Sequence, residues 1–282
     1  MYEILAFFLS VVLTGVLYYF MQPIINSTAC IRSNYRGNPI TSIGGILFIV
    51  PLIILTIINF VLYDADLIKL PLSNIAVFLV LGFGFLGLID DLIGNRDVQG
   101  FKGHILSIFK GKLTTGGLKL FGGPLLCLLA FLPDVKNGGY IYIFSIAIFI
   151  SLIANLTNLF DLAPGRSLKL SIITLVIFGI IANVTNHYGA VGILLVLLYF
   201  DLKEYIMLGD IGSNAIGAYI GTVLAINMNQ KQLYIAIVIV LFFNLMSEFI
   251  SFSKIIQSFI PLRILDGLGQ SIDRKEWIKK KS

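Results

Sequence analysis

The sequence predicts an all-α membrane protein, a polytopic helical bundle with about nine transmembrane spans. Of its 282 residues, 57% are hydrophobic and only 12% are charged, whereas soluble domains average about 25% charged residues. The hydrophobic residues also form runs of roughly 17–21 residues, the length that a helix needs to cross about 30 Å of hydrocarbon. The basic residues lie in short loops between these runs, so the net charge of +5 does not point to nucleic acid.

Nine apolar runs predict the spans in order. Their ranges are 3–21, 43–63, 73–90, 120–133, 140–158, 168–185, 189–207, 212–228 and 233–252. No basic residue precedes the first run and no small-residue cleavage site follows it, so we expect a signal-anchor-like helix and not a removable signal peptide. Pro164 disfavours helix at Ala163, so the fifth span should end by about Leu162.

The loop charges predict an orientation. All but three of the 20 basic residues fall on one side of this arrangement, and the exceptions are Lys69, Lys136 and Lys231. The positive-inside rule then places the N-terminus outside and the C-terminus in the cytoplasm. We expect residues 1–252 to form the bundle and residues 253–282 to form a basic cytoplasmic tail of the same domain. Trp277 and the lysines after it suit either a surface helix on anionic lipid or a solvated tail.

Polar residues gather at the predicted cytoplasmic ends of the spans. Asp90 and Asp91 close the third span, and charge near hydrocarbon is costly unless it is paired, hydrated or metal-bound. Asn155, Asn158 and Asp161 close the fifth span at a spacing of three, so they share roughly one helix face. The segment Gly209-Asp210-Ile211-Gly212-Ser213 separates the seventh and eighth spans, and Glu248 lies in the cytoplasmic half of the ninth.

Each motif alone also fits a structural role, since Gly-Asp segments form turns and an Asn at a helix end is often a cap. Together on one membrane face they predict a single cleft of carboxylates and amides. Basic loops on that face can contact phosphate oxygens. Such a set of side chains can hold Mg²⁺ and a nucleotide diphosphate together, since Mg²⁺ prefers carboxylate and phosphate oxygens.

In this combination the chain resembles the polyprenyl-phosphate N-acetylhexosamine-1-phosphate transferase family, which is glycosyltransferase family 4-like and includes the phospho-MurNAc-pentapeptide translocase. The match rests on the basic first cytoplasmic loop running into Ser42-Ile43-Gly44-Gly45, the Asp90-Asp91 pair, the block from Asn155 to Asp161, and the segment from Gly209 to Ser213. Glu248 also stands where the family has a glutamate in its ninth helix. The chain is identified as a divergent member.

The resemblance implies a membrane enzyme that transfers a sugar-1-phosphate from a UDP-sugar to polyprenyl (undecaprenyl) phosphate and releases UMP, in bacterial cell-envelope glycan synthesis. It implies Mg²⁺, with Mn²⁺ as an alternative, and a place in the bacterial cytoplasmic membrane, and it leaves a homodimer open. It assigns catalysis and metal binding to Asp90, Asp91 and Asp210. It places Asn155, Asn158 and Asp161 beside the nucleotide.

The sequence departs from the family pattern at several positions. Pro164 stands where the family has a second Asp, and the family's His-containing last cytoplasmic loop is missing. The cations that could replace the missing groups at the substrate phosphates are Arg166, Lys169, Arg263 and those of the loop from Lys102 to Lys119. Two alternatives to the transferase remain: a catalytically silent homologue that binds a lipid-linked or nucleotide ligand as a scaffold, and a transporter. The acids cluster at one face and not at mid-span, which disfavours the transporter.

Overall fold

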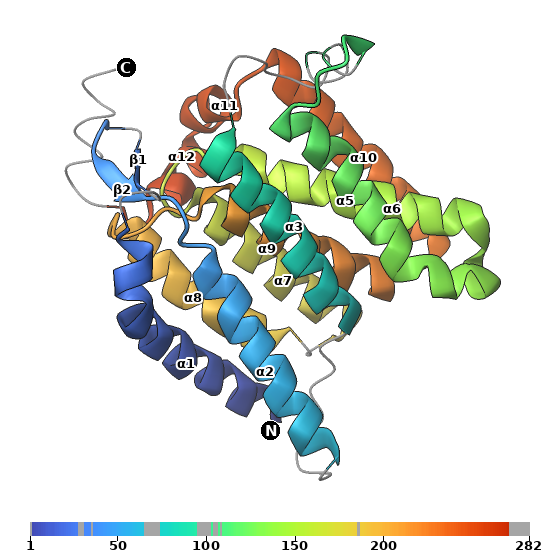
Figure 1. The fold of residues 1–282 in the computed structure, drawn as a ribbon, viewed down its shortest axis with the longest axis horizontal. Coiled ribbons are helices and arrows are strands. Elements are labelled where there is room, and N and C mark those ends of the chain that lie inside the picture. The colour runs from blue at the N-terminus through green and yellow to red at the C-terminus, as the bar shows by residue number, and fades with distance from the viewer. Residues whose placement is uncertain are drawn as a thin grey trace.

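The computed structural model describes residues 2–27, 31–34, 36–64, 74–94, 103, 107, 109–184 and 187–270. These residues are helical apart from turns, connections and one small hairpin (Figure 1). The long helices in this part of the chain are α1 (Tyr2–Ile25), α2 (Ile46–Asp64), α3 (Asn74–Ile93), α5 (Thr115–Phe131), α6 (Val135–Phe160), α7 (Arg166–Ala182), α8 (Tyr188–Leu202), α9 (Gly209–Asn227) and α10 (Gln230–Phe249). The short elements are β1 (Ile31–Ser33), β2 (Pro39–Thr41), the 3₁₀ turn η2 (Leu132–Asp134), α11 (Phe252–Ser258) and α12 (Ile260–Gly267).

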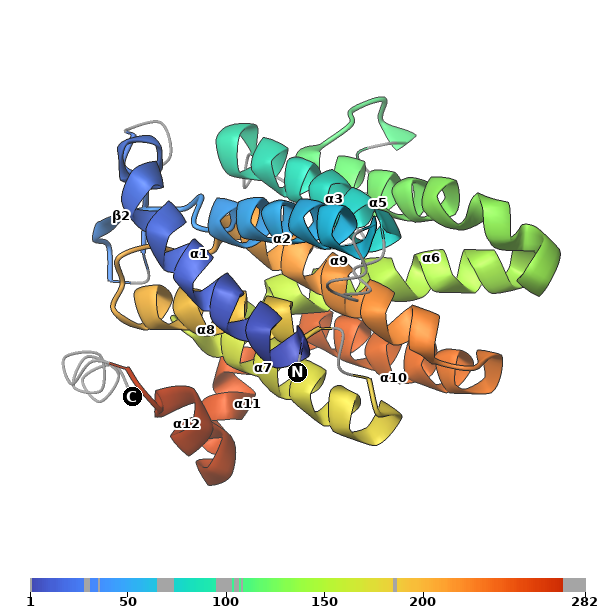
Figure 2. The same cartoon turned by 90° about the horizontal axis from the view of Figure 1, so that it is seen from below.

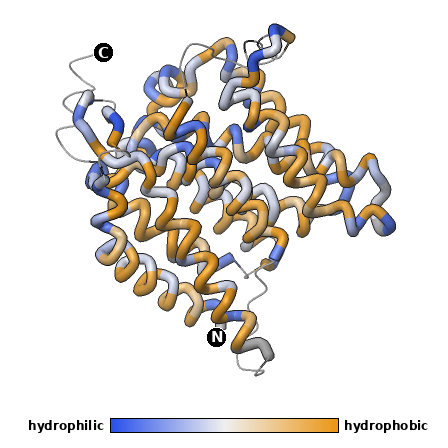
Figure 3. Tube along the Cα trace, in the orientation of Figure 1, coloured by the Kyte–Doolittle hydropathy of each residue, from blue (hydrophilic) through white to orange (hydrophobic). Residues whose placement is uncertain are grey.

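The all-helical membrane class is confirmed. Five helical segments of the described chain are long and apolar enough to cross a membrane: Glu3–Ile25, Asn74–Ile93, Thr115–Asp134, Gly138–Phe160 and Gln230–Phe249. The apolar helices Ile46–Val61 and Tyr188–Leu202 are shorter. Each of the nine predicted ranges overlaps one long helix, while the number of spans and their orientation stay predictions. Hydrophobic residues dominate the helices along their length (Figure 3).

The helix ends differ from the prediction in two places that shape the site. Helix α5 begins at Thr115, because the Thr114 side chain accepts a hydrogen bond from the Gly117 amide at 3.0 Å and caps the first turn. Lys119, expected in a loop, is therefore a helical residue. Helix α8 ends at Leu202, so the end of the predicted seventh span is an irregular segment. Helix α6 ends at Phe160, as Pro164 predicts.

Helix α9 is the centre of the bundle. Every residue from Ile211 to Ala225 is buried, and the helix packs chiefly against α3 and α6, while α1 packs on α8 (Figures 1 and 2). A helix that is buried all round must meet its neighbours closely on every side. The small residues along α9 allow this.

Glycines bring the start of α9 against the segment that precedes α2. The amides of Gly44 and Gly45 donate to the carbonyls of Met207 and Leu208, each at 3.0 Å. A Cβ atom on Gly45 would lie 2.1 Å from the Cα atom of Gly212, where no side chain fits. The Gly44-Gly45 and Gly209–Ser213 motifs of the sequence are therefore two sides of one backbone contact.

We expect Gly45→Ala to destabilise the protein by about 1–3 kcal/mol, because the added methyl group forces α9 away from residues 44–45. Gly15→Ala is the matched control, since a Cβ at Gly15 meets nothing within 4 Å, and alanine in a helix should be neutral or stabilising. Thermal unfolding of the detergent-solubilised variants measures both. Equal midpoints for the two variants would refute the close contact.

Candidate active site

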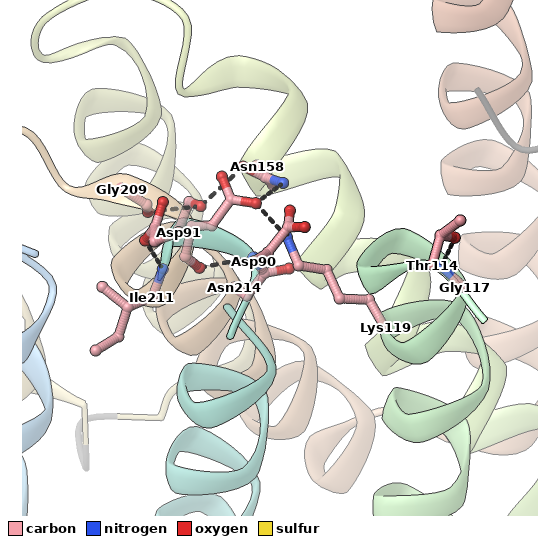
Figure 4. A network of polar contacts seen from close by, with 11 residues as sticks. Asp90, Asp91, Thr114, Gly117, Lys119, Asn158, Gly209, Ile211 and Asn214 are labelled. Carbon is pink, nitrogen blue, oxygen red and sulfur yellow. Dashed lines mark hydrogen bonds and ion pairs between the residues drawn. The ribbon is translucent and has the colours of Figure 1, made fainter. Parts of the chain in front are cut away.

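The structure brings the three predicted aspartates together. Asp90 and Asp91 lie in the last turn of α3, and Asp210 lies in the first turn of α9. An oxygen of Asp90 and one of Asp210 both contact the Nζ atom of Lys119, at 2.6 Å for Asp90 (Figure 4). Asp91 Oδ2 accepts a hydrogen bond from the Ile211 amide at 3.0 Å. The predicted convergence of these side chains is therefore what the structure shows.

Asp91 accepts a hydrogen bond from a backbone amide in the first turn of α9. The first amides of a helix have no partner within the helix, and its positive end favours a carboxylate. The approach requires glycine at position 209, which has φ +67° and where a Cβ would lie 2.8 Å from Asp91 Oδ2 and 1.7 Å from the Ser42 carbonyl oxygen. Asp91 thus has a structural partner that sequence reasoning did not provide.

Lys119 is predicted from the sequence only as the end of a basic loop, with no connection to the aspartates. It reaches from α5 between Asp90 and Asp210, and its side chain is 17% exposed. Like-charged carboxylates in a partly buried site repel each other unless a cation lies between them. The signal that could have found it is Thr114, whose capping preference predicts a helix start early enough to include Lys119.

The two predicted asparagines have different surroundings. Asn158 lies at the site: its Nδ2 is 3.5 Å from Asp210 Oδ2, and its Oδ1 accepts from Ser213 Oγ at 3.0 Å. Asn155 Nδ2 instead donates to Asn244 Oδ1 on α10 at 2.6 Å. Neither asparagine is among the residues that line the cavity described below, and the place of Asn155 beside the nucleotide stays a prediction. The Asn155 amide has a partner within the bundle, where an unpaired amide would be costly.

A cavity of about 920 Å³ opens beside these residues. Its lining residues are Arg32, Ser33, Asn34, Ile40, Ser42, Asp90, Asp91, Gly94, Asp161, Leu162, Ala163, Pro164, Asp201, Glu204, Ile206, Met207, Gly209 and Asp210. Acidic side chains predominate, so the cavity favours a cation or a ligand that arrives with one.

Burial and the nearby carboxylates, chiefly Asp201, raise the pKa of Asp161 well above its ordinary value. Glu248, in the last turns of α10, is not among the lining residues.

The β1–β2 hairpin forms one wall of this cavity. Its strands are antiparallel, with Ile31 opposite Thr41. Glu204 fastens it by accepting from Arg36 Nη2 at 2.8 Å and from Asn34 Nδ2 at 3.0 Å. Arg32 Nη2 donates to the Asp91 carbonyl oxygen at 2.5 Å, which places a guanidinium group at the edge of the acidic site.

Arg166 and Lys169 are not among the residues that line the cavity. Both side chains contact the C-terminal helices, and their role at a substrate phosphate stays a prediction. Arg166 forms a bidentate pair with Asp266, at 2.9 and 3.0 Å, and its Nη1 donates to Ser253 Oγ at 2.8 Å. Lys169 Nζ donates to the carbonyls of Leu265 and Asp266 at 3.1 and 2.7 Å. The side chain of Arg166 is directed to α12 by the carboxylate of Asp266, which lies 100 residues later in the sequence. Lys102 lies outside the described residues.

The donor set fits a divalent cation only in part. No group of three His, Cys, Asp or Glu side chains within the described part of the chain is arranged to hold a metal ion. Mg²⁺, however, is commonly bound by one or two carboxylates together with phosphate oxygens and water. Asp90 and Asp210 already converge on the ammonium group of Lys119. Binding of Mg²⁺ by these two carboxylates together with phosphate oxygens therefore suits the site better than binding by Asp90, Asp91 and Asp210 alone.

Comparison with known proteins points in one direction. A family model described as glycosyl transferase family 4 matches residues 73–229. The chain is 26% identical over 207 residues to a phospho-N-acetylmuramoyl-pentapeptide-transferase of Clostridium botulinum (strain Eklund 17B / Type B), covering 68% of this chain and 61% of that protein. Proteins of the same name in Clostridium beijerinckii and Petrotoga mobilis are 29% and 26% identical over 184 and 203 residues. These matches cover 60% and 67% of this chain, and 56% and 61% of the relatives. The chain therefore spans about three-fifths of the length of such relatives. The family match includes Asp90, Asp91, Lys119 and Asp210.

We expect Lys119→Met to lower the unfolding temperature in EDTA, because two carboxylates lose the ammonium group between them. Mg²⁺ should raise the unfolding temperature of this variant more than that of the wild type, since a bound cation stabilises the folded state and no longer competes with the lysine. Thermal unfolding across a Mg²⁺ titration measures both effects. A variant that Mg²⁺ stabilises no better than wild type would argue against a cation between Asp90 and Asp210.

Asp91→Ala should cost about 1 kcal/mol of stability through the loss of the acceptor at the start of α9, whereas Asp91→Asn, which keeps an acceptor oxygen, should cost less. Chemical or thermal unfolding of the two variants under the same conditions provides the comparison. If Asn and Ala are equally damaging, the charge of Asp91 matters and its hydrogen bond to Ile211 does not.

Proposed function

The chain belongs to glycosyl transferase family 4, and we propose that it transfers a sugar-1-phosphate from a UDP-sugar to a polyprenyl phosphate at the cytoplasmic face of a bacterial membrane, releasing UMP. The single observation that carries the proposal is the meeting of Asp90, Lys119 and Asp210 beside an acidic cavity at the ends of apolar helices. Carboxylates that can hold a cation, beside ammonium and guanidinium groups, suit a reaction between phosphates. Relatives named as phospho-N-acetylmuramoyl-pentapeptide-transferases support the same reaction type.

The proposed reaction exchanges one phosphoanhydride bond for another. An oxygen of the lipid phosphate attacks the β-phosphorus of the UDP-sugar. The bond from that phosphorus to the bridging oxygen breaks, and UMP leaves with the electron pair. The products are UMP and a lipid-linked diphosphate sugar. No oxidant or reductant is needed, so the chain's task is to position the phosphates and to offset their charge.

We assign the basic side chains to the phosphate oxygens and the acidic side chains to the cation. Lys119 and Arg32 can contact phosphate oxygens, the first from between Asp90 and Asp210 and the second from the hairpin wall. Mg²⁺, held by Asp90 and Asp210, would shield the charge of the diphosphate. Asn158 can donate to the nucleotide. Asp161, which keeps its proton to higher pH than an ordinary aspartate, can donate a hydrogen bond as well as accept one.

A catalytically silent homologue remains the second candidate, and two observations favour it. Arg166 and Lys169 are committed to the C-terminal helices, and Lys119 already lies between Asp90 and Asp210. Such a protein would bind the same nucleotide or lipid-linked ligand as a scaffold. Turnover, measured separately from binding, distinguishes the two functions.

We expect purified protein in nanodiscs to release UMP from at least one UDP-sugar of a panel when undecaprenyl phosphate and Mg²⁺ are present. Asp210→Asn should reduce the rate by about a thousandfold or more, since it removes one charge where the phosphates react. Asp134→Asn is the matched control: it makes the same substitution in η2, between α5 and α6 and outside the cavity, and should leave the rate unchanged.

Two results would contradict the proposal. Near-normal turnover in Asp210→Asn would place the chemistry elsewhere. Tight UDP-sugar binding by calorimetry, without UMP release from any member of the panel, would favour the scaffold.

A further inference from the structure

Helix α12 has its apolar side outside and its acidic side inside. Ile260 and Ile264 are spaced by four and lie on one side of the helix, and each is 60% exposed. Leu268, which directly follows the helix in an extended conformation, is 55% exposed. Asp266 lies two residues beyond Ile264, which is a rotation of about 200° in a helix, and it faces the protein. This is the reverse of the pattern that water imposes on a surface helix.

Arg166 holds α12 in this orientation. The two oxygens of Asp266 accept from Arg166 at 2.9 and 3.0 Å, and the exposed fractions of the two side chains are only 11% and 7%. Lys169 adds hydrogen bonds to the carbonyls at the end of the helix. A buried bidentate pair with further polar partners fixes direction as well as distance. The outward position of the apolar side is therefore determined by the contacts on the inner side.

We propose that α12 lies in the headgroup layer of the membrane at the cavity end of the bundle, with Ile260, Ile264 and Leu268 reaching the acyl chains. Helices α11 and α12 stand off the edge of the bundle below α7 and α8 (Figure 2). They follow α10 directly in the chain, and the lipid-exposed side of α10 continues to Phe249, which is 86% exposed. An amphipathic helix in the membrane plane buries such an apolar side without a protein partner.

The size of the apolar side supports lipid over a second protein. A helix of eight residues is about 12 Å long, and a stable protein interface buries about 800 Å² on each partner. Two aliphatic side chains on so short a helix, with a third directly after it, cannot provide that area. A bilayer is already present around the bundle and needs no such interface.

The same contacts connect α12 to the acidic cavity. Arg166 begins α7, and only Gly165 separates it from residues 161–164, all of which line the cavity. Gln270 Nε2, just beyond α12, donates to the Pro164 carbonyl oxygen at 3.4 Å. The membrane-facing helix is therefore braced against the loop that forms one wall of the cavity. This inference goes beyond the proposed reaction and does not depend on turnover.

Site-directed spin labelling of the full chain in nanodiscs of phosphatidylethanolamine and phosphatidylglycerol tests the proposal. Labels are placed at Ile264→Cys, Leu268→Cys and, as the aqueous control, Lys203→Cys, an exposed residue in the turn beside the cavity. Cys30→Ser removes one native thiol, and Cys127 is fully buried. We expect the ratio of oxygen to nickel-chelate accessibility at 264 and 268 to be at least about threefold higher than at 203, because oxygen concentrates in lipid.

A ratio at both positions equal to that at 203 would place α12 in water and overturn the proposal. Labels that are immobile and inaccessible to both reagents would show that protein covers α12, and would also overturn it.

The role of the Arg166–Asp266 pair in holding α12 is tested separately. Asp266→Ala should increase the mobility of the label at 264, and the charge exchange Arg166→Asp with Asp266→Arg should restore it, even if the single variant folds poorly. Unchanged mobility in Asp266→Ala, in protein that remains folded, would refute the role of Arg166. All of these readouts are independent of activity, so a failure of the proposed transferase reaction would leave them intact.

Discussion

The start of α9 imposes the constraint from which the site follows. This helix is buried along nearly its whole length, so the amides of its first turn cannot rely on water. Asp91 supplies an acceptor from α3, and the glycines at 45, 209 and 212 let neighbouring backbone approach. The same contacts fix where Asp90 and Asp210 project. A requirement of helix termini thus brings two carboxylates from distant parts of the chain to one ammonium group.

Four cations at or near the cavity in the described part of the chain have a specific acidic partner or carbonyl. Lys119 contacts Asp90 and Asp210, Arg36 contacts Glu204, and Arg166 contacts Asp266. The cavity itself remains acidic, with Arg32 at its edge. A diphosphate can enter such a site only with compensating positive charge. This is a physical reason, separate from any likeness to other proteins, to expect a divalent cation and its phosphate ligand to bind together.

The sequence predicted the helices and the convergence of the acids well, because both depend on strong local signals. Apolar runs mark the helices, and Asp90, Asp91 and Asp210 stand at their ends. Contacts between distant residues were beyond this reasoning. The spacing of Asn155 and Asn158 correctly puts them near one face, but Asn244 on α10 decides which of them reaches the site. The role of Arg166 likewise depends on Asp266, which no local pattern connects to it.

The proline at position 164, where the family pattern has an Asp, affects the residues that follow it as well as the cavity. Pro164 ends the preceding segment and provides no amide hydrogen, so the turn to α7 relies on Gly165, whose amide donates to Asp201 at 2.5 Å. The next residue is then the first of α7, with its side chain toward α12 and not toward the cavity. The turn that would carry a second Asp in the family pattern has Pro164 here, and it leads to Arg166, whose side chain contacts α12. Residues 161–165 therefore connect the cavity lining to Arg166 and, through the ion pair with Asp266, to α12.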